Sequence, residues 1–221
     1  MTVNFDHHRA NRTGIAEVIL AEPKTPEDLE SAINQSLQLN NSVLITRILR
    51  LHIDVVAKAA TFNDVNIIWD PYQRTAILGE VPECEDTTRI AVISAGTSDQ
   101  PIVEEILLSL TYFGLSAKSF SDVGVAGLHR HQEVLEELSV DGNIRILIVV
   151  AGNEGALFPV VSGQTKLPVI AVPTSIGYGF GGKGETALRS ALQACSPGVV
   201  TVNIDNGFGA AAFSKKFLQN L

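Results

Sequence analysis

The stretch Ile90-Ala-Val-Ile-Ser-Ala-Gly-Thr-Ser-Asp99 decides how most of this chain folds. The apolar run Ile90–Ser94 is typical of a buried strand, and a glycine, two hydroxyl residues and an acid follow it closely. Apolar residues then recur at helical spacing from Ile102 to Leu110. A buried strand followed at once by a helix is the repeating unit of a parallel sheet with helices on its faces.

The same alternation continues to residue 204. Strands are predicted over 117–120, 144–150, 169–172 and 199–204, and helices over 128–138, 155–163 and 185–194. Pro159 interrupts the middle helix unless that helix begins late or is kinked. We therefore expect an α/β domain over residues 88–221, in three layers around a parallel sheet. Ligands of such sheets bind outside the carboxyl ends of the strands.

Residues 1–85 are more polar and irregular, and they predict a smaller α+β domain. Its expected elements are a strand over 17–21, a helix that Thr25 caps and Pro26 begins, a strand over 43–46, and a hairpin of 65–69 and 74–78 around the turn Asp70–Gln73. The polar segment 82–87 is the expected linker.

Composition excludes several classes of function. With 24 acidic and 16 basic residues the net charge is −8, which disfavours a nucleic-acid partner. No apolar stretch approaches the roughly 20 residues of a membrane span, and the N-terminus lacks the apolar segment of a secretory signal. Two cysteines far apart suit a reducing compartment, so we expect a cytoplasmic protein.

The loops after the predicted strands hold the residues of chemical interest. Ser94–Asp99 supplies hydroxyls and backbone N–H groups that suit a phosphate or a carboxylate; the alternative is a simple helix cap. His129 and Arg130 are predicted to contact an anionic substrate, unless they only begin a solvated helix. Glu154 lies between Gly152 and Gly155 and is a candidate general acid or base, with a helix-capping role as the alternative.

A glycine-rich loop, Gly177–Gly184, follows the strand predicted over 169–172. Its first six residues match G-x-G-x-x-G, and Asp205 falls about where a dinucleotide fold places its ribose-binding acid. The match is weak, because Pro173–Ile176 separates strand and glycines and too little chain follows Asp205 for a full dinucleotide fold. The loop is still predicted to cradle an anion through its N–H groups and Lys183.

Cys195 lies between this loop and a second one, Asn203–Gly209. A lone thiol in that position is a candidate nucleophile, and the alternative is a small buried hydrophobic residue. The chain has only one other cysteine, Cys84 in the acidic linker, so a disulfide or a cysteine metal site is not expected.

Together these residues resemble the LarB family of pyridinium-3,5-biscarboxylic acid mononucleotide synthases, and more distantly the PurE carboxyaminoimidazole ribonucleotide mutases. The resemblance spans nearly the whole chain. The stretches that carry it are Asp6–Arg9, Arg12, Gly14, Glu17–Ile19, Ala95–Asp99, Asp122–Arg130, Glu154–Leu157, Pro168–Gly179, Cys195–Gly198 and Val202–Ala210.

The resemblance implies a PurE-like, flavodoxin-like domain behind a separate N-terminal domain, assembled as a homo-oligomer, usually an octamer. The implied reaction carboxylates the pyridinium ring of nicotinic acid adenine dinucleotide with CO2 or bicarbonate and cleaves the phosphoanhydride to release AMP; Mg²⁺ would suit that cleavage. Cys195 and Glu154 are the expected catalytic residues. The expected substrate-binding residues are Ser94, Gly96, Thr97, Ser98, Asp99, Asp122, His129, Arg130, Gly152, Ser175, Gly177, Tyr178, Gly179, Asp205 and Asn206.

The implied chemistry explains the thiol. A pyridinium ring is an electrophile, and addition of a thiolate converts it to an enamine whose carbon can attack CO2. Asn153, Phe158, Gln164–Lys166 and Lys183–Glu185 depart from the family pattern. PurE enzymes carry a histidine in the loop after the strand 144–150, and this chain has none there. A PurE-like mutase or carboxylase therefore ranks second, and a dinucleotide sensor without chemistry is the alternative from another class.

Overall fold

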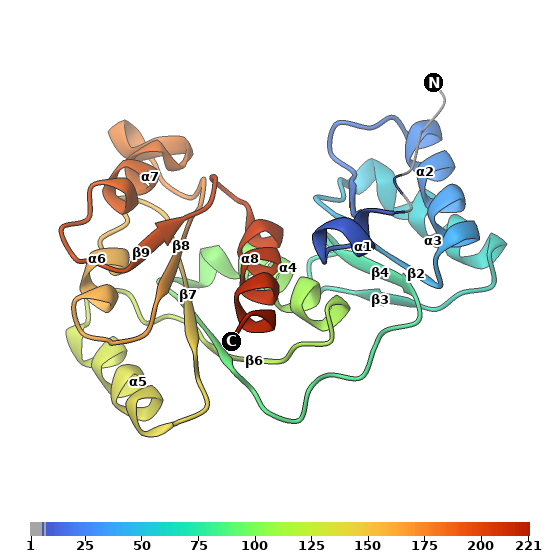
Figure 1. Cartoon of the computed structure of the whole chain (residues 1–221). Helices are drawn as coiled ribbons and strands as arrows, with labels where there is room; N and C mark the ends of the chain where they lie inside the picture. The colour runs from blue at the N-terminus through green and yellow to red at the C-terminus, as the bar shows by residue number, and fades with distance from the viewer. Residues whose placement is uncertain (1–5, 7) are drawn as a thin grey trace. The chain divides into compact units, whose positions relative to one another are not determined.

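The computed structural model describes Asp6 and residues 8–221 (Figure 1). The first five residues and His7, which include part of the motif Asp6–Arg9, lie outside the described residues. The chain divides into two compact units. The first comprises Met1–Glu83 with Thr111–Gly114, and the second comprises Cys84–Leu110 with Leu115–Leu221.

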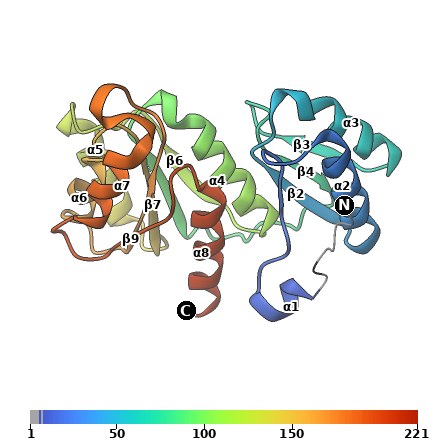
Figure 2. The same cartoon turned by 90° about the horizontal axis from the view of Figure 1, so that it is seen from above.

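The first unit is a four-stranded sheet with helices packed on it (Figures 1 and 2). Its strands are β1 (Ile19–Leu20), β2 (Ser42–Thr46), β3 (Ile67–Trp69) and β4 (Ala76–Gly79), in the order β1-β2-β4-β3. Its helices are α1 (Arg9–Thr13), α2 (Pro26–Leu39), the 3-10 turn η1 (Arg50–His52) and α3 (Ile53–Phe62). The pairing of β1 with β2 is parallel and the other pairings are antiparallel. This is the α+β character that the sequence predicts.

Local sequence signals place these elements closely. The Thr25 hydroxyl accepts the Asp28 N–H at 3.2 Å, and Pro26 begins α2. β3 and β4 form the predicted hairpin. In its turn, the buried carboxylate of Asp70 accepts the backbone N–H groups of Tyr72 at 2.6 Å, Arg74 at 2.9 Å and Thr75.

Asp70→Ala is expected to destabilise this unit by about 2 kcal/mol or more, because it leaves three backbone donors without their acceptor. The single tryptophan of the chain, Trp69, precedes Asp70 in β3, so the fluorescence of Trp69 during urea unfolding of the full chain reports on this unit. The exposed Asp86 of the linker is the control, and Asp86→Ala should change the free energy of unfolding by no more than about 0.5 kcal/mol. Equal unfolding midpoints for the two variants would contradict this role.

The second unit is a five-stranded parallel sheet in the order β6-β5-β7-β8-β9. Its strands are β5 (Ile90–Ser94), β6 (Ala117–Phe120), β7 (Ile146–Ala151), β8 (Val169–Pro173) and β9 (Val199–Thr201). Its helices are η2 (Thr97–Asp99), α4 (Gln100–Tyr112), α5 (Leu128–Val140), α6 (Leu157–Ser162), η3 (Gly179–Gly184), α7 (Glu185–Leu192) and α8 (Gly207–Gln219). This strand order is that of flavodoxin-like folds, whose binding site lies at the switch point between the first and third strands.

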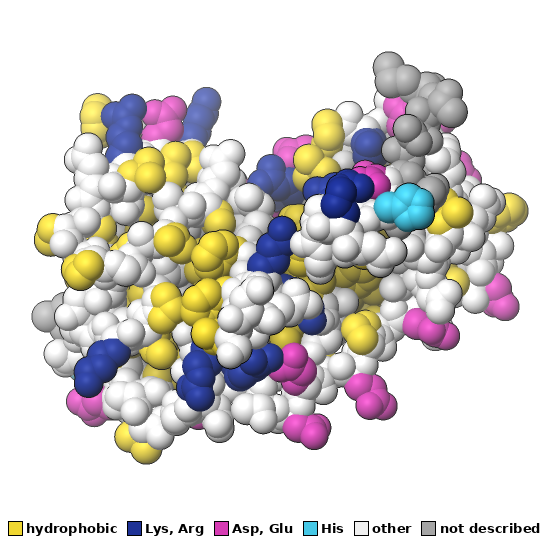
Figure 3. All heavy atoms as spheres, viewed as in Figure 1, with side chains coloured by type: hydrophobic (Ala, Val, Ile, Leu, Met, Phe, Trp, Pro, Cys, Tyr) yellow, Lys and Arg dark blue, Asp and Glu magenta, His cyan; other side chains and the backbone are white. Residues whose placement is uncertain are grey.

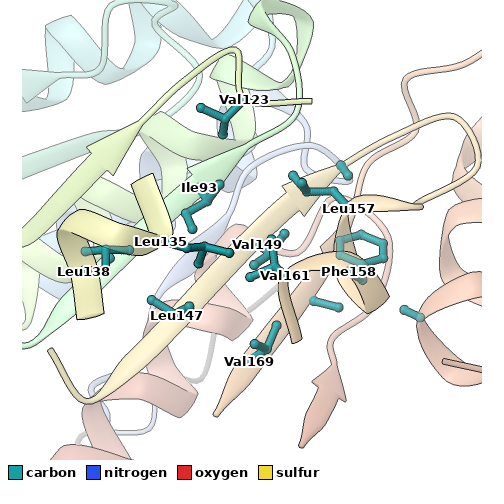
Figure 4. Close-up of a cluster of buried hydrophobic side chains, with 14 of the residues drawn as sticks. Ile93, Val123, Leu135, Leu138, Leu147, Val149, Leu157, Phe158, Val161 and Val169 are labelled. Carbon is teal, nitrogen blue, oxygen red and sulfur yellow. The ribbon is translucent and has the colours of Figure 1, made fainter. Parts of the chain in front are cut away.

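Helices cover the sheet on both faces, as predicted. Helices α5, α6 and α7 lie on one face and α4 and α8 on the other (Figures 1 and 2). On the first face the central strands and these three helices share one buried cluster, in which Leu135, Leu147, Phe158 and Val169 are drawn in Figure 4. On the other face, the buried carboxylate of Glu105 in α4 accepts the Phe208 N–H at 2.9 Å, in the first turn of α8.

Several boundaries differ from the prediction by a few residues, and two of these differences have a clear physical reason. Helix α6 begins at Leu157 rather than Gly155, which puts Pro159 in the first turn, where a missing N–H breaks no helical hydrogen bond. Strand β9 ends at Thr201 rather than at residue 204, and Asp205 follows in a turn with φ of 55°. Among the described residues, no helix is long and apolar enough to cross a membrane.

Candidate active site

A cavity of about 250 Å³ opens at the carboxyl ends of β5 to β8. It is the place where the fold is expected to bind a ligand. The predicted site residues Gly96, Ser98, Asp99, Gly152 and Glu154 line it. The other lining residues are Ala95, Gly124, Val125, Ala126, Ala151, Asn153, Ala156, Leu157 and Ile176.

Glu154 is presented to this cavity by a tight turn that needs glycine on both sides. A side chain on Gly152 would lie 2.3 Å from the Ile176 carbonyl oxygen, and one on Gly155 would lie 2.9 Å from the Ala187 Cα. The Asn153 N–H donates to the Ile176 carbonyl at 2.8 Å, which ties the turn to the segment after β8. Glycines at these two positions let the backbone pack closely while the carboxylate stays at the surface.

The helix-cap alternative for Glu154 is not supported. The residue before α6 is Ala156, and no side chain caps that helix end. The Glu154 side chain is exposed and lines the cavity. Its carboxylate is therefore available to a bound molecule.

Asp99 is the second carboxyl group of the cavity, and it is 97% shielded from solvent, with an exposed fraction of 3%. Its carboxylate accepts a hydrogen bond from the Thr174 hydroxyl at 2.7 Å and another from the Gly96 N–H at 3.1 Å. Burial raises the pKa of Asp99; the hydrogen bonds from Thr174 and Gly96 oppose the rise, and the nearby charge of Asp205 adds to it.

The raised pKa of Asp99 predicts a specific pH dependence of stability. Between the ordinary carboxyl pKa and the raised one, the folded chain keeps a proton that the unfolded chain has lost. The free energy of unfolding contributed by Asp99 is therefore highest in acid and falls as the pH rises through that window. Asp99→Asn cannot ionise, so its stability relative to the wild type should improve across the same window in urea unfolding.

Asp141 provides a control of opposite sign. Its hydrogen bond with Lys118 lowers the pKa of Asp141, so its contribution is present above the ordinary carboxyl pKa and is lost as the pH falls through the lowered one. Asp141→Asn should therefore lose stability relative to the wild type as the pH rises through that lower range. A difference between Asp99→Asn and the wild type that does not vary with pH would contradict the assignment.

Several other predicted residues lie at the same sheet edge but outside the cavity lining. Asp122 and Arg130 form an ion pair with each other at 3.1 Å, and His129 beside them is exposed. Asp205 accepts the Ser175 N–H at 2.8 Å and so joins the segments after β8 and β9. The remaining ones are Thr97, exposed in η2; Gly177, Tyr178 and Gly179, in the loop after β8; and Asn206, whose side chain caps α8 by accepting the Gly209 N–H.

Ser94 is fully buried, and its hydroxyl accepts a hydrogen bond from the Gln100 side chain at 3.2 Å. That contact is internal to the unit. The position of Ser94 at the end of β5 follows the prediction, but the cavity is lined by the residues after it.

Cys195 is exposed, so it is not the small buried hydrophobic residue of the alternative interpretation. The structure does not bring it to the cavity that Glu154 lines. Helix α7 ends at Leu192, and Cys195 lies in the bend before β9. Its neighbour Ser196 donates to the Pro159 carbonyl at 2.9 Å, and Gly198 accepts the Val169 N–H at 3.0 Å, at the amino end of β8. The five residues of β8 rise roughly 15 Å towards the cavity edge.

The described residues offer no cluster of three or more His, Cys, Asp and Glu side chains that could hold a metal ion. Mg²⁺ is commonly held by one or two carboxylates together with substrate phosphates. The carboxyl groups that line the cavity are those of Asp99 and Glu154, and the Asp99 carboxylate already accepts hydrogen bonds from Thr174 and Gly96.

Sequence reasoning missed two kinds of residue. Thr174 holds the buried carboxylate of Asp99 from 75 positions away, and no local pattern indicates such a pair. Ile176 and Asn153 line the cavity because their segments cross at the sheet edge. The only indication in the sequence was that Ile176 and Asn153 lie in the segments that follow β8 and β7.

Comparisons with known proteins agree with this geometry. A model of the AIR carboxylase family matches residues 89–220, and a model of the LarB/PurE-like N-terminal domain matches residues 1–78. An uncharacterized protein of Methanocaldococcus jannaschii is 35% identical over 216 residues, which are 96% of this chain and 82% of that protein. The N5-carboxyaminoimidazole ribonucleotide mutase of the same organism is 35% identical over 131 residues, 58% of this chain and 78% of the mutase.

Among solved structures, a PurE2 variant from Treponema denticola superposes with a TM-score of 0.52 at 20% identity, covering 61% of this chain and 81% of that one. At this identity the likeness concerns the fold alone. The expected PurE-like α/β fold with an additional N-terminal domain is confirmed.

Proposed function

We propose, since this chain belongs to the AIR carboxylase family and carries a LarB/PurE-like N-terminal domain, that it carboxylates the pyridinium ring of nicotinic acid adenine dinucleotide. In the same active site it hydrolyses the phosphoanhydride, so the products are pyridinium-3,5-biscarboxylic acid mononucleotide and AMP. The observation that carries the proposal is the free Glu154 carboxylate at the mouth of the cavity, in a chain that also keeps an exposed Cys195.

The proposed reaction begins with the Cys195 thiolate. Its sulfur adds to a ring carbon, and the ring nitrogen takes up the electron pair to give a neutral dihydropyridine. The resulting enamine carbon attacks CO2 and forms the new carbon–carbon bond. Glu154 removes the proton from that carbon, and the electrons expel the thiolate, which restores the aromatic pyridinium. Water attacks the phosphoanhydride and AMP leaves; Mg²⁺ bound to the phosphates would neutralise their charge in this step.

Because Cys195 lies away from the cavity, the proposed reaction requires that two or more copies of the chain assemble. If both residues act on one ring, Cys195 reaches the cavity from a second copy of the chain, and the active form is a closed homo-oligomer. Helix α8 supports this, because Phe213 is 44% exposed and stacks with Phe217 along its outer side. Figure 3 shows further hydrophobic side chains gathered beside α8 on the face in view. A stable monomer at micromolar concentration in sedimentation would contradict this assembly.

A PurE-like mutase or carboxylase that acts on an aminoimidazole ribonucleotide is the second candidate. Its support is the 35% identity with the mutase of Methanocaldococcus jannaschii. The loop after β7, Gly152–Ala156, holds Glu154 and no histidine, which favours the pyridinium substrate. The two free thiols suit the reducing cytoplasm as the site of either reaction.

Mass analysis of products tests the two candidates directly. The full chain is incubated with bicarbonate, Mg²⁺ and either nicotinic acid adenine dinucleotide or an aminoimidazole ribonucleotide. Release of AMP with a doubly carboxylated pyridinium mononucleotide is expected from the dinucleotide. Turnover of the aminoimidazole compound alone would establish the second candidate. Binding of the dinucleotide without any product would indicate a sensor.

A further inference from the structure

The loop Gly177–Gly184 holds two aromatic side chains in water beside the cavity. Tyr178 is 88% exposed and Phe180 is 100% exposed. Single exposed hydrophobic residues are common at protein surfaces. Two large exposed rings on one glycine-rich loop beside a ligand cavity are less common than single exposed residues. Rings exposed in this way can stack on a planar group of a ligand.

Both ends of the loop are fixed, so the rings are held near the cavity. At the start, Ile176 lines the cavity and its carbonyl accepts the Asn153 N–H. At the end, Gly184 is buried, and a side chain there would lie 2.7 Å from the Thr174 carbonyl oxygen. Between these two ends, Gly179 and Gly182 are not packed against other parts of the chain, because a side chain added at either position would meet nothing within 4 Å.

The size of the cavity leaves part of the proposed substrate outside it. A volume of about 250 Å³ lies below the roughly 300–1,000 Å³ of pockets for drug-sized ligands. It suits the nicotinate ribotide half, whose ring must reach Glu154. The adenosine half of a dinucleotide then extends over the rim, and Ile176 leads from the cavity into the aromatic loop.

We propose that Phe180, together with Tyr178, forms a stacking platform for the adenine base, so that this loop selects the dinucleotide over the mononucleotide. The inference rests on the proposed function. A purine has a π-face that stacks well on an aromatic ring. Lys183 on the same loop is exposed and supplies a positive charge towards the two phosphates between the halves.

Isothermal titration calorimetry without bicarbonate tests the platform with two probes, nicotinic acid adenine dinucleotide and nicotinic acid mononucleotide. Phe180→Ala should weaken dinucleotide binding about ten-fold and leave mononucleotide binding unchanged. Phe180→Trp should retain the wild-type preference, since it keeps a ring at that position. Phe62→Ala is the control, because Phe62 is 79% exposed in the first unit and is expected to change neither affinity.

Equal weakening of both ligands by Phe180→Ala, or of neither, would overturn the platform while leaving the proposed function in place. A change in the sedimentation coefficient of Phe180→Ala would instead assign the ring to a contact between copies and would also overturn it. Failure of the wild type to bind the dinucleotide would overturn the proposed function, and the platform with it.

Discussion

Cys195→Ser is expected to bind nicotinic acid adenine dinucleotide with wild-type affinity and to lose carboxylation by roughly three orders of magnitude or more. A serine hydroxyl is not ionised near neutral pH, whereas a thiol supplies the thiolate that the addition to the ring requires. A thiolate also leaves readily when the ring becomes aromatic again. Product formation is measured by mass analysis, and binding is measured by calorimetry on the same preparations.

Cys84→Ser is the matched control. Cys84 is exposed, and its Sγ lies 3.6 Å from the Leu115 carbonyl oxygen, away from the cavity lining. The turnover of Cys84→Ser should equal that of the wild type. Near-normal turnover of Cys195→Ser would remove the covalent step from the mechanism.

Mixing variant subunits tests whether Cys195 acts across copies. Chains with Cys195→Ser and chains with Glu154→Gln are each expected to be inactive. If the two residues come from different copies, a co-expressed one-to-one mixture should recover roughly a quarter of the wild-type activity, because random pairing unites an intact Glu154 with an intact Cys195 at one site in four. No recovery would mean that both residues act within one chain.

Glu154→Gln is expected to stop the reaction one step later than Cys195→Ser. Without the carboxylate, the proton on the newly carboxylated carbon is not removed, so CO2 is lost again and the ring stays attached to Cys195 as the dihydropyridine. The adduct should appear as near-ultraviolet absorbance and as added mass on the intact protein. The melting temperature should change little, because α6 has no side-chain cap to lose.

Glu185→Gln is the control for Glu154→Gln. Glu185 is an exposed glutamate in the first turn of α7, paired with Arg189, and it does not line the cavity. Its replacement should leave turnover unchanged. Full product formation by Glu154→Gln, without an adduct, would remove the general base from the mechanism.

The fold was predictable because its signals are local. Four of the five strands of the second unit are largely apolar runs, and β6, with Lys118 and Ser119, is the exception. Each strand is followed by a segment that the sequence marks with glycine or polar residues. Pro159 shows the limit of this reasoning. A proline excludes the helix interior but does not say whether the helix starts later or bends, and the later start follows from packing of Leu157 and Phe158 in the core.

The site was predictable in part, for a geometric reason. The carboxyl ends of parallel strands meet at one edge, which brings Gly96, Asp99 and Glu154 together. Cys195 precedes β9, as the predicted strand over 199–204 already implied, so it does not share the edge at which the strands end. The Thr174–Asp99 pair depends on the register of β5 and β8 within the sheet, which single-sequence patterns do not specify.

The contact between Glu105 and Phe208 can form only late in translation. The chain emerges from the ribosome from its N-terminus, so α4 is made about a hundred residues before the helix that covers it. Gly207 fits closely against this surface, since a side chain there would lie 3.0 Å from the Ile102 carbonyl oxygen. The second unit can therefore complete its outer layer only after residues 207–219 have been translated, and a ribosome that stalls earlier leaves a nascent chain that presents the uncovered face of α4 to chaperones.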